Sequence, residues 1–282
     1  MNTVQECLST LFSLRKPGED EYINDTDKLV YCRACRTPRQ TVITLPGSTL
    51  RFYPPVMCIC QKEKAEREEA ALEQVRFRRK VEQLKAAGLQ DEMLRTYTFE
   101  NDKGYTPQIK KARKYVESFD TFEKHGEGLL MWGNVGSGKT FMAGCIANAL
   151  LDKGIPVFMT NFSRILLRLT GTLNEDKNAF LDSMNSYRLL IIDDLGIERS
   201  TEFALEQVFS VIDRRCRSSL PMIITTNMTL NAMKNPEDIA HARIYDRVLE
   251  RCLPIKVTGD RIRQQRADEH IREFQDLLAS KT

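Results

Sequence analysis

The eight residues from 133 to 140 have the types and the spacing that bind a phosphate group. They match the pattern G-x-x-x-x-G-K-[ST] at every fixed position and are Gly133, Asn134, Val135, Gly136, Ser137, Gly138, Lys139 and Thr140. Glycines allow a loop to wrap a phosphate with its backbone N–H groups, and the positive end of a following helix adds to the attraction. Lys139 supplies a charge for the terminal phosphates, and the Thr140 hydroxyl can complete the shell of a Mg²⁺ ion. The segment therefore predicts a site for a nucleotide with Mg²⁺.

Two neighbouring carboxylates follow the apolar run LLII and supply a second part of this chemistry. We expect Asp193 and Asp194 at the carboxyl end of a strand beside the phosphate loop, where ligands bind in parallel sheets. Asp193 is then the Mg²⁺ contact, and Asp194 polarises the attacking water. Asn227 ends the strand MIITTN and is placed to orient that water. The alternative is that these residues only cap turns, which is common for Asp and Asn.

The base of the nucleotide is indicated by a motif that the sequence lacks. Residues 193–196 satisfy the D-x-x-G pattern of GTPases, but N-K-x-D, which reads guanine, does not occur. We therefore predict ATP. The two carboxylates and Asn227 favour water as the acceptor over a small-molecule kinase reaction, which needs an arginine-rich lid and an acceptor site. A binding module with an inert phosphate loop is the third hypothesis.

Alternating apolar strands and helices position these residues. Strands are expected at 128–133, 155–162, 188–196, 221–227 and 253–259, and helices at 140–154, 201–218 and 238–252, with two polar helices between 162 and 187. Continuous Ile, Val and Leu runs separated by helices indicate a parallel sheet that is covered on both faces. The fold class is therefore α/β, a parallel-sheet P-loop NTPase domain over residues 95–282.

The sequence before this domain has a different character. Residues 61–88 have no proline, many opposite charges four positions apart and Gly88 as a stop, which predicts a solvated connecting helix rather than a coiled-coil partner. Residues 1–60 are irregular and rich in Pro, Gly and Cys. We therefore expect an N-terminal module at 1–60, a charged helical linker at 61–94 and the NTPase domain at 95–282.

Four cysteines of the N-terminal module are grouped like metal ligands. They form one C-x-x-C pair, Cys32 and Cys35, and one C-x-C pair, Cys58 and Cys60. Four thiolates can surround Zn²⁺ tetrahedrally, and a short segment with few core residues needs such help to fold. The second pair is shorter than the common zinc spacing, so unrelated reduced thiols are the alternative.

Three arginines recur every four residues near the carboxyl end of the chain. Arg243, Arg247 and Arg251 form one charged face of the predicted helix 238–252. One hypothesis is ion pairing with acids nearby in the sequence, which are Glu237, Asp246 and Glu250. The other is an arginine finger that reaches the terminal phosphate held by an adjacent subunit. The sequence leaves both open.

Composition narrows the class of protein. The 282 residues include 42 Lys and Arg against 39 Asp and Glu, a net charge of +3, which does not by itself indicate nucleic acid. Apolar residues make up 41% and charged residues 29%, which excludes collagen-like and wholly disordered chains. No apolar run approaches the ~20 residues of a membrane span, and the first twenty residues, with one short apolar patch, are unlike a signal peptide. We expect a cytoplasmic protein without a membrane partner.

Together these motifs resemble those of the AAA+ branch that contains the bacterial replicative-helicase loaders of the DnaC and DnaI kind. They are also similar to those of the IstB transposition ATPases. The resemblance covers about residues 96–259 and rests on GNVGSGKT, LLIIDDLGIE, IITTN and RVLER, with Asp-Asp where the family has Asp-Glu. It implies an AAA+ domain of the ASCE type. Residues 260–282 have room for one helix, so we expect no helical lid domain.

The resemblance also implies a role for each matching residue. These roles are Walker A for Lys139 and Thr140, Walker B for Asp193 and Asp194, sensor 1 for Asn227, the arginine finger for Arg247 and the second arginine of that box for Arg251. The arginine roles imply self-association, because a finger acts on the nucleotide of a neighbouring subunit.

The function implied by the resemblance is ATP-dependent loading of a hexameric replicative DNA helicase onto single-stranded DNA as replication begins, with slow hydrolysis as a switch. Loaders of the DnaI kind carry a comparable N-terminal zinc module with a C-x-C half, which contacts the helicase. This favours Zn²⁺ at the four cysteines, although arginines in the same module leave DNA contact open. The alternative is an IstB-like transposition ATPase, which binds duplex DNA and more often has an all-helical N-terminal extension.

Overall fold

The protein is described here by a computed structural model. It describes residues 15–259 except 45, 48, 105–106, 171–173 and 197–200, and after them Ala267, Ile271, Arg272, Phe274, Gln275 and Leu278. The helix predicted after the last strand therefore lies largely outside the described residues. The chain divides into two compact units, Met1–Arg78 and Arg79–Thr282.

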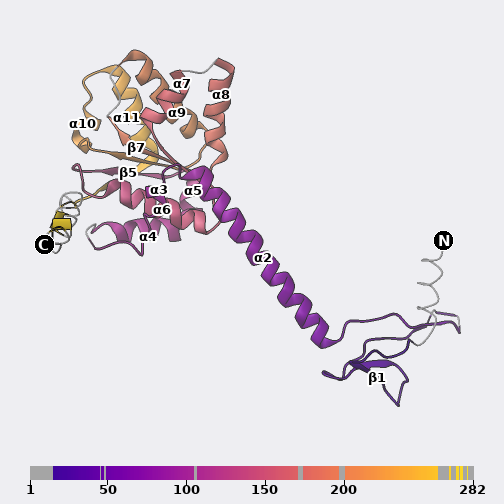
Figure 1. Cartoon of the computed structure of the whole chain (residues 1–282). Coiled ribbons are helices and arrows are strands. Elements are labelled where there is room, and N and C mark those ends of the chain that lie inside the picture. Colours follow the sequence, from indigo (N-terminus) through magenta and orange to yellow (C-terminus); the bar gives the residue numbers. More distant parts are fainter. Residues whose placement is uncertain are drawn as a thin grey trace. The chain divides into compact units, whose positions relative to one another are not determined.

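A five-stranded sheet organises the unit Arg79–Thr282 (Figure 1). Its strands are β5 (Gly128–Trp132), β6 (Val157–Asn161), β7 (Leu189–Leu195), β8 (Met222–Thr226) and β9 (Cys252–Lys256). Their order is β6-β7-β8-β5-β9, and every neighbouring pair is parallel, which confirms the predicted α/β class. β8 lies between β5, which precedes the phosphate loop, and β7, which carries the two acids.

Helices cover both faces of this sheet, as its uninterrupted apolar strands predict (Figure 1). One face packs against α3 (Glu92–Arg95), α4 (Ile109–Glu117), α5 (Phe119–His125) and α6 (Lys139–Asp152). The other packs against α7 (Phe162–Thr170), α8 (Asn174–Ser183), the 3₁₀ helix η1 (Met184–Ser186), α9 (Glu202–Arg217), α10 (Leu230–Lys234) and α11 (Ile239–Arg251). No loop separates α11 from β9, so the helix predicted to reach Cys252 ends one residue earlier.

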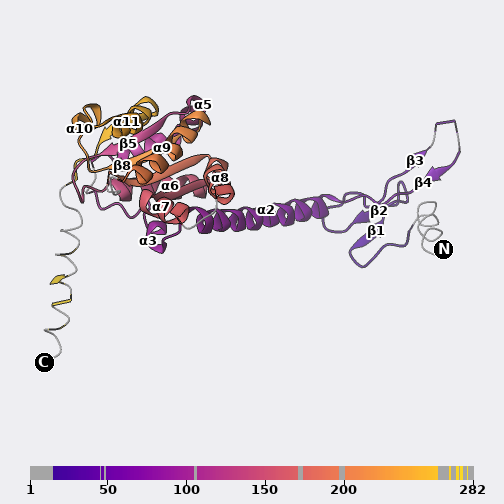
Figure 2. The same ribbon diagram turned by 90° about the horizontal axis from the view of Figure 1, so that it is seen from above.

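Short strand pairs and turns make up the described part of the unit Met1–Arg78 before its helix (Figure 2). The antiparallel pairs are β1 (Glu21–Ile23) with β2 (Val30–Cys32), and β3 (Ile43–Thr44) with β4 (Arg51–Phe52). The buried apolar side chains among described residues 15–58 are Leu29, Val30, Cys32 and Cys58. A two-stranded pair is marginal in water without further packing, so this region needs another source of stability.

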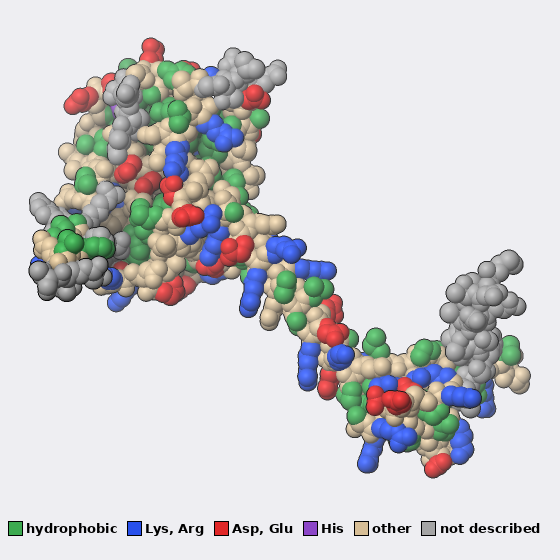
Figure 3. Space-filling view, viewed as in Figure 1, with side chains coloured by type: hydrophobic (Ala, Val, Ile, Leu, Met, Phe, Trp, Pro, Cys, Tyr) green, Lys and Arg blue, Asp and Glu red, His purple; other side chains and the backbone are tan. Residues whose placement is uncertain are grey.

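The helix α2 (Ile59–Gly88) is long and polar. Every residue from 59 to 80 is exposed, and side chains of both charges lie along it (Figure 3), as predicted for a solvated helix. Its end packs tightly, because a Cβ on Gly88 would lie 2.0 Å from the carbonyl oxygen of Val157. In the described part of the chain, no helix combines the length and the apolar character needed to cross a membrane.

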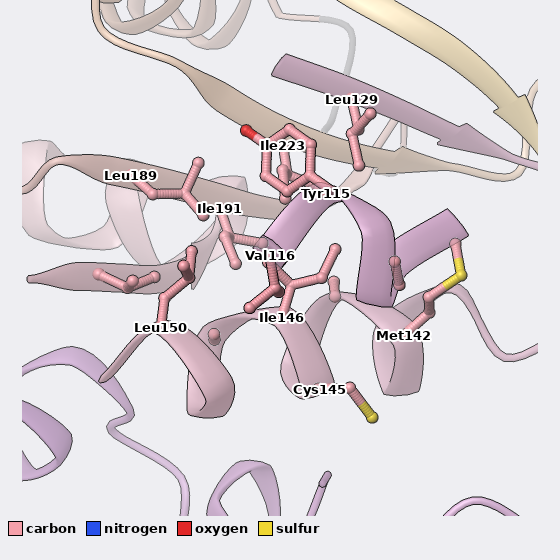
Figure 4. Packing of buried hydrophobic residues seen from close by; sticks show 14 of the residues in the cluster. Tyr115, Val116, Leu129, Met142, Cys145, Ile146, Leu150, Leu189, Ile191 and Ile223 are labelled. Atoms are coloured by element: carbon pink, nitrogen blue, oxygen red, sulfur yellow. The ribbon is translucent and has the colours of Figure 1, made fainter. Parts of the chain in front are cut away.

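Buried side chains on both faces hold the strands in register. On one face Tyr115 and Val116 of α4 and Ile146 and Leu150 of α6 pack near Ile191 of β7 (Figure 4). The residues of β5 alternate, since Leu129 and Met131 join this cluster while Leu130 joins the other. The carboxyl ends of the strands are aligned as a result, and Trp132 is the register partner of Thr226.

Candidate functional site

The phosphate loop joins β5 to α6 at the carboxyl edge of the sheet. Gly136 and Gly138 have φ angles of 80° and 96°, which side chains rarely allow. Gly133 is required for space, because a Cβ there would lie 2.3 Å from the carbonyl oxygen of Val257. The glycines of the motif therefore determine the path of the loop, and Lys139 begins the helix that follows it.

Lys139 is held inside this loop with its side chain almost completely buried. Its ammonium donates to Gly133 O at 3.0 Å, to Asn134 O at 2.9 Å and to Asn227 Oδ1 at 2.8 Å. The last contact joins two predicted site residues from different parts of the sequence. An ammonium has three donors and no acceptor, so phosphate oxygens can replace any of these partners without leaving the charge unpaired.

Asp193 and Thr140 are brought together as the sequence predicts. The Thr140 hydroxyl lies 3.1 Å and 3.0 Å from the two carboxylate oxygens of Asp193. Thr225 of β8 also donates to Asp193, at 2.5 Å, and accepts from the backbone N–H of Asp194 at 2.9 Å. Sequence reasoning missed Thr225, although a hydroxyl near the end of the neighbouring strand was a visible signal.

Asp194 lies at an irregularity in the pairing of β7 with β8. The register shifts between Ile192 and Leu195, and Asp194 has a φ of 60°. Aspartate tolerates this left-handed conformation better than most residues, and such a bulge changes the direction of the side chains beside it. The two acids therefore do not simply alternate across the sheet, which sequence alone did not indicate.

Burial sets the protonation behaviour of Asp193. Loss of solvent raises the pKa of this carboxyl above its usual range, and the neighbouring Asp194 raises it further. Hydrogen bonds from Thr225 and Thr140 and the charge of Lys139 act in the opposite direction without reversing the shift. A carboxylate with a raised pKa gains from a cation that pairs with its ionised form.

A hydrogen-bonded turn after β8 positions Asn227. The Thr226 hydroxyl donates to Leu195 O at 2.8 Å and accepts from the N–H of Met228 at 3.1 Å. Asn227 and Asn134 also line a cavity of about 250 Å³ beside the loop, together with Trp132 and Lys256. The phosphate loop therefore has an open space beside it, next to Asn227, that a ligand can enter.

A residue that the motif leaves variable also indicates that the loop fits a nucleotide phosphate. The Ser137 side chain is 1% exposed and its hydroxyl has no hydrogen-bond partner. Buried hydroxyls are normally paired, so this oxygen is available to a ligand in the loop. Val135 is exposed and offers only its backbone. Together with Lys139 and the Thr140–Asp193 pair, the donor set suits a triphosphate with Mg²⁺.

Arg247 and Arg251 lie on α11 and contact other charged groups there. Arg247 donates through Nη1 to Glu250 at 2.9 Å, and its Nε lies 3.3 Å from Asp213 Oδ1. Arg251 Nε lies 3.8 Å from Glu250 Oε1. Within the described residues neither arginine pairs with residues 133–140, Asp193 or Asn227. The structure thus assembles loop, acids and amide, but does not bring the two arginines to them.

The four clustered cysteines form a second site, in the unit Met1–Arg78. The Sγ atoms of Cys32, Cys35, Cys58 and Cys60 all lie within 4.8 Å of one another. Zn–S bonds of about 2.3 Å in a tetrahedron give sulfur–sulfur edges of about 3.8 Å, so the cluster is compact enough for one Zn²⁺. A hydrogen bond with the Thr37 hydroxyl lowers the pKa of Cys35 to about 5, whereas the hydrogen bond with Cys35 raises the pKa of Cys60 to about 11.

The sheet order, the loop and the acids define a class, the AAA+ type of P-loop NTPase. A crystal structure of DnaI has this fold, with a TM-score of 0.50 and 24% identity over 61% of this chain and 96% of that one. A family model described as IstB-like ATP binding protein matches residues 54–270. This is more than half of the chain, and the protein belongs to that family.

Two curated relatives are also similar to this chain in sequence. The replicative helicase loader DnaI of Bacillus subtilis (strain 168) is 26% identical over 157 residues, which is 52% of this chain and 50% of the relative. The replicative helicase loader DnaC of Escherichia coli (strain K12) is 26% identical over 196 residues, which is 67% of this chain and 77% of the relative. The chain thus spans about half the length of the DnaI relative.

Proposed function

We propose that this protein is an ATP-dependent loader that places a hexameric replicative DNA helicase on single-stranded DNA when replication begins. The observation that carries the proposal is the similarity to two relatives that are named replicative helicase loaders. The contacts among Lys139, Asn227, Thr140 and Asp193 support an ATP-driven step. ATP binding and slow hydrolysis act as the switch, and the protein works in the cytoplasm.

We assign each residue of the site a role in hydrolysis. Lys139 exchanges loop carbonyls for phosphate oxygens, so its charge remains paired. Thr140 and Asp193 are the residues that would hold Mg²⁺, which neutralises phosphate charge when it is bound. Asp194 accepts a hydrogen bond from the attacking water, and Asn227 orients that water. The water and the phosphate then meet at the carboxyl edge of the sheet.

A second subunit supplies the remaining cation. A trans-acting arginine can raise the rate of such a site by ~10³–10⁵. We assign Arg247 of one subunit to the terminal phosphate held by the next, with Arg251 beside it on the same nucleotide. ATP thereby promotes self-association, because the nucleotide binds residues from two subunits at once.

The N-terminal module provides the contact with the helicase. We propose that residues 1–60 form this module around one Zn²⁺, that 61–94 link it to the ATPase, and that 95–282 are the AAA+ domain. The clustered Sγ atoms support the zinc site. Four thiolates close the coordination shell of Zn²⁺ and leave no open position, so the metal is structural and the module surface binds the partner.

A second candidate is an ATPase that assists transposition by binding duplex DNA. It is favoured by the family match, which is to the IstB-like ATP binding proteins. The two candidates differ in the partner, since a loader binds a helicase hexamer and a transposition ATPase binds duplex DNA with a transposase. The cysteine cluster favours the loader, because transposition ATPases of the IstB kind more often have an all-helical N-terminal extension.

Co-sedimentation of the full chain with the hexameric helicase of its host tests the proposal. We expect a complex in the presence of ATP that is lost after zinc chelation or in Cys58→Ser. Cys7→Ser is the matched control, because Cys7 belongs to neither of the two cysteine pairs in the sequence, and it should bind like the natural chain. In Lys139→Ala, formation of the helicase complex should no longer depend on ATP.

The outcomes separate the two candidates. The loader hypothesis fails if no helicase complex forms in ATP or in ADP. ATP-dependent retention on duplex DNA without any helicase complex would instead support the transposition ATPase. Full helicase binding by Cys58→Ser would remove the N-terminal module from the proposal but leave the ATP switch intact.

A further inference from the structure

The helices α9 and α11 pack so that their polar positions meet in steps of four residues. The Arg243 guanidinium lies 4.3 Å from the centre of the Phe209 ring. One step further along both helices, Arg247 Nε lies 3.3 Å from Asp213 Oδ1. The carbonyl oxygen of Arg247 also accepts from Cys216 Sγ of α9, at 3.7 Å. Side chain and backbone of Arg247 are thus both attached to α9.

Asp213 is an unusual partner because it is buried. Its side chain is 10% exposed, whereas the side chain of Arg247 is 40% exposed. Its Oδ2 is 2.8 Å from Nε of Arg217, but its Oδ1 accepts no hydrogen bond. A buried carboxylate oxygen without a hydrogen bond is costly, so the nearby guanidinium of Arg247 is the charge that compensates it.

The two sides of the Arg247 guanidinium have different partners. The Nε side faces Asp213, whose side chain is largely buried. The Nη1 nitrogen donates to Glu250, whose side chain is 46% exposed and lies on the same helix. An exposed pair of this kind contributes little free energy and exchanges easily for a stronger anion. A phosphate can therefore replace Glu250 while Asp213 keeps its contact.

We propose that Asp213 is the positioning residue for Arg247, holding the Nε side of the guanidinium so that its terminal nitrogens meet the phosphate of a neighbouring subunit. This inference rests on the proposed trans role of Arg247. Asp213 itself touches no substrate. It acts by keeping a long, otherwise mobile side chain in one orientation, which reduces the entropy lost on contact.

Asp213 also lies in the same strand–helix segment, β7 and α9, as the acids of the ATP site. The helix α9 follows β7 in the chain, and β7 carries Asp193 and Asp194. This segment therefore carries both the carboxylate proposed to bind the metal in its own subunit and the residue that positions the arginine for the neighbouring subunit. This arrangement suits an enzyme whose subunits act in a row, each completing its neighbour.

Mixing of two defective variants tests the inference. The acceptor is Arg247→Ala, which keeps an intact nucleotide site but offers no finger. The donor is Lys139→Ala, which offers the finger but has an impaired nucleotide site. Three further donors carry Asp213→Asn, Glu250→Gln or Arg247→Ala in addition to Lys139→Ala. ATP hydrolysis is measured in each mixture at saturating ATP.

We expect the Lys139→Ala donor to restore hydrolysis and the donor that also lacks Arg247 to restore none. The Asp213→Asn donor should restore about 10- to 100-fold less, because misplacement of a reacting group by about 1 Å has an effect of this size. The Glu250→Gln donor should restore as much as Lys139→Ala alone or more. Equal restoration with and without Asp213 would overturn the inference and leave the trans arginine standing. If no donor restores hydrolysis, the trans role falls, and the inference falls with it.

Single variants separate positioning from loss of the fold. Asp213→Asn in the otherwise natural chain should lower kcat with an unchanged KM for ATP, because its own nucleotide site is complete. Asp213→Glu keeps the charge and should recover most of kcat. The matched control is Asp182→Asn in α8, which removes the 2.7 Å ion pair with Arg214. Arg214 lies on α9, the helix that also carries Asp213. A parallel loss of kcat in Asp182→Asn, or a rise in KM in Asp213→Asn, would contradict the assignment.

Discussion

The two units of this protein differ in the contacts that stabilise each of them. The described residues among 15–60 bury few apolar side chains and include four cysteines whose Sγ atoms are clustered. The unit Arg79–Thr282 has an apolar cluster on each face of its sheet. The second unit is thus stabilised mainly by burial of apolar area, whereas the first has few apolar contacts and, under the proposed function, relies on Zn²⁺ for much of its stability.

A buried carboxylate in each unit shows the same contrast. Burial raises the pKa of Glu21, but hydrogen bonds from Arg15, the Gly18 N–H and Arg39 outweigh it and lower the pKa to about 2. Burial also raises the pKa of Asp193, and there the hydroxyl partners do not reverse the shift. The partners of Glu21 therefore favour its ionised form, whereas the surroundings of Asp193 favour the protonated form.

Removal of zinc should give the largest effect and be confined to one unit. Structural Zn²⁺ contributes ~10–16 kcal/mol to the folding of small zinc peptides at neutral pH. We therefore expect chelation to remove the hydrogen-exchange protection of residues 15–58 while the thermal transition of the ATPase unit stays unchanged. A Ca²⁺-selective chelator is the control. Retained protection without zinc would mean that the ion pairs of Glu21 and the short strands suffice.

The second prediction concerns Arg215, a buried cation in the apolar unit. Its side chain is 1% exposed and donates to the carbonyl oxygens of Pro221, Tyr187 and Arg188 at 2.9–3.0 Å. Burial lowers its pKa to about 10, yet it stays charged at neutral pH. Because Arg215→Met leaves these carbonyls unpaired, we expect a loss of about 3 kcal/mol, seen as a lower Tm.

The neighbouring Arg214 gives the control for that prediction. Its pair with Asp182 is partly exposed, so Arg214→Ala should change stability by less than about 1 kcal/mol. Equal losses for the two arginines would show that the carbonyl contacts of Arg215 carry no special weight. Neither change should alter the exchange protection of residues 15–58, because those residues belong to the other unit.

The features that the sequence predicts well are local. The alternation of strands and helices follows from apolar periodicity, and the loop at 133–140 follows from a motif in which each residue type has a physical reason. Residues that end two strands were also expected to meet, since parallel strands share one carboxyl edge. Contacts between Lys139 and Asn227 and between Thr140 and Asp193 agree with that argument.

The features that the sequence does not reveal depend on contacts between distant residues. Thr225 joins Asp193 only because β8 lies beside β7, and the bulge at Asp194 depends on the same pairing. Asp213 and Arg215 are both buried, while Arg214 between them is not, and periodicity alone cannot say which charged residue of α9 faces α11. Glu250 was among the expected partners of the arginines, but Asp213 was not.

The smallest predicted effect compares the two buried acids directly. Asp193→Asn should stabilise the ATPase unit by about 1 kcal/mol without nucleotide, because it removes a charge that burial disfavours. Glu21→Gln should instead lower the exchange protection of residues 15–58 in zinc-loaded protein at pH 7, because it removes an anion paired with Arg15 and Arg39. The same amide replacement thus has opposite signs in the two units.

The pH dependence provides the decisive measurement for Asp193. Its raised folded pKa means that the folded state holds the proton more tightly than the unfolded state, whose pKa is near 3.8. The natural chain therefore loses stability relative to Asp193→Asn as pH rises through the folded pKa, and the difference disappears below pH 3.8. Thermal melting of both proteins between about pH 3.5 and about pH 7 measures this difference in stability. That pH range begins near the usual aspartate pKa and ends well above it. A gap that stays constant over that range would show that the substituted amide acts through its hydrogen bonds to Thr140 and Thr225 rather than through the loss of charge.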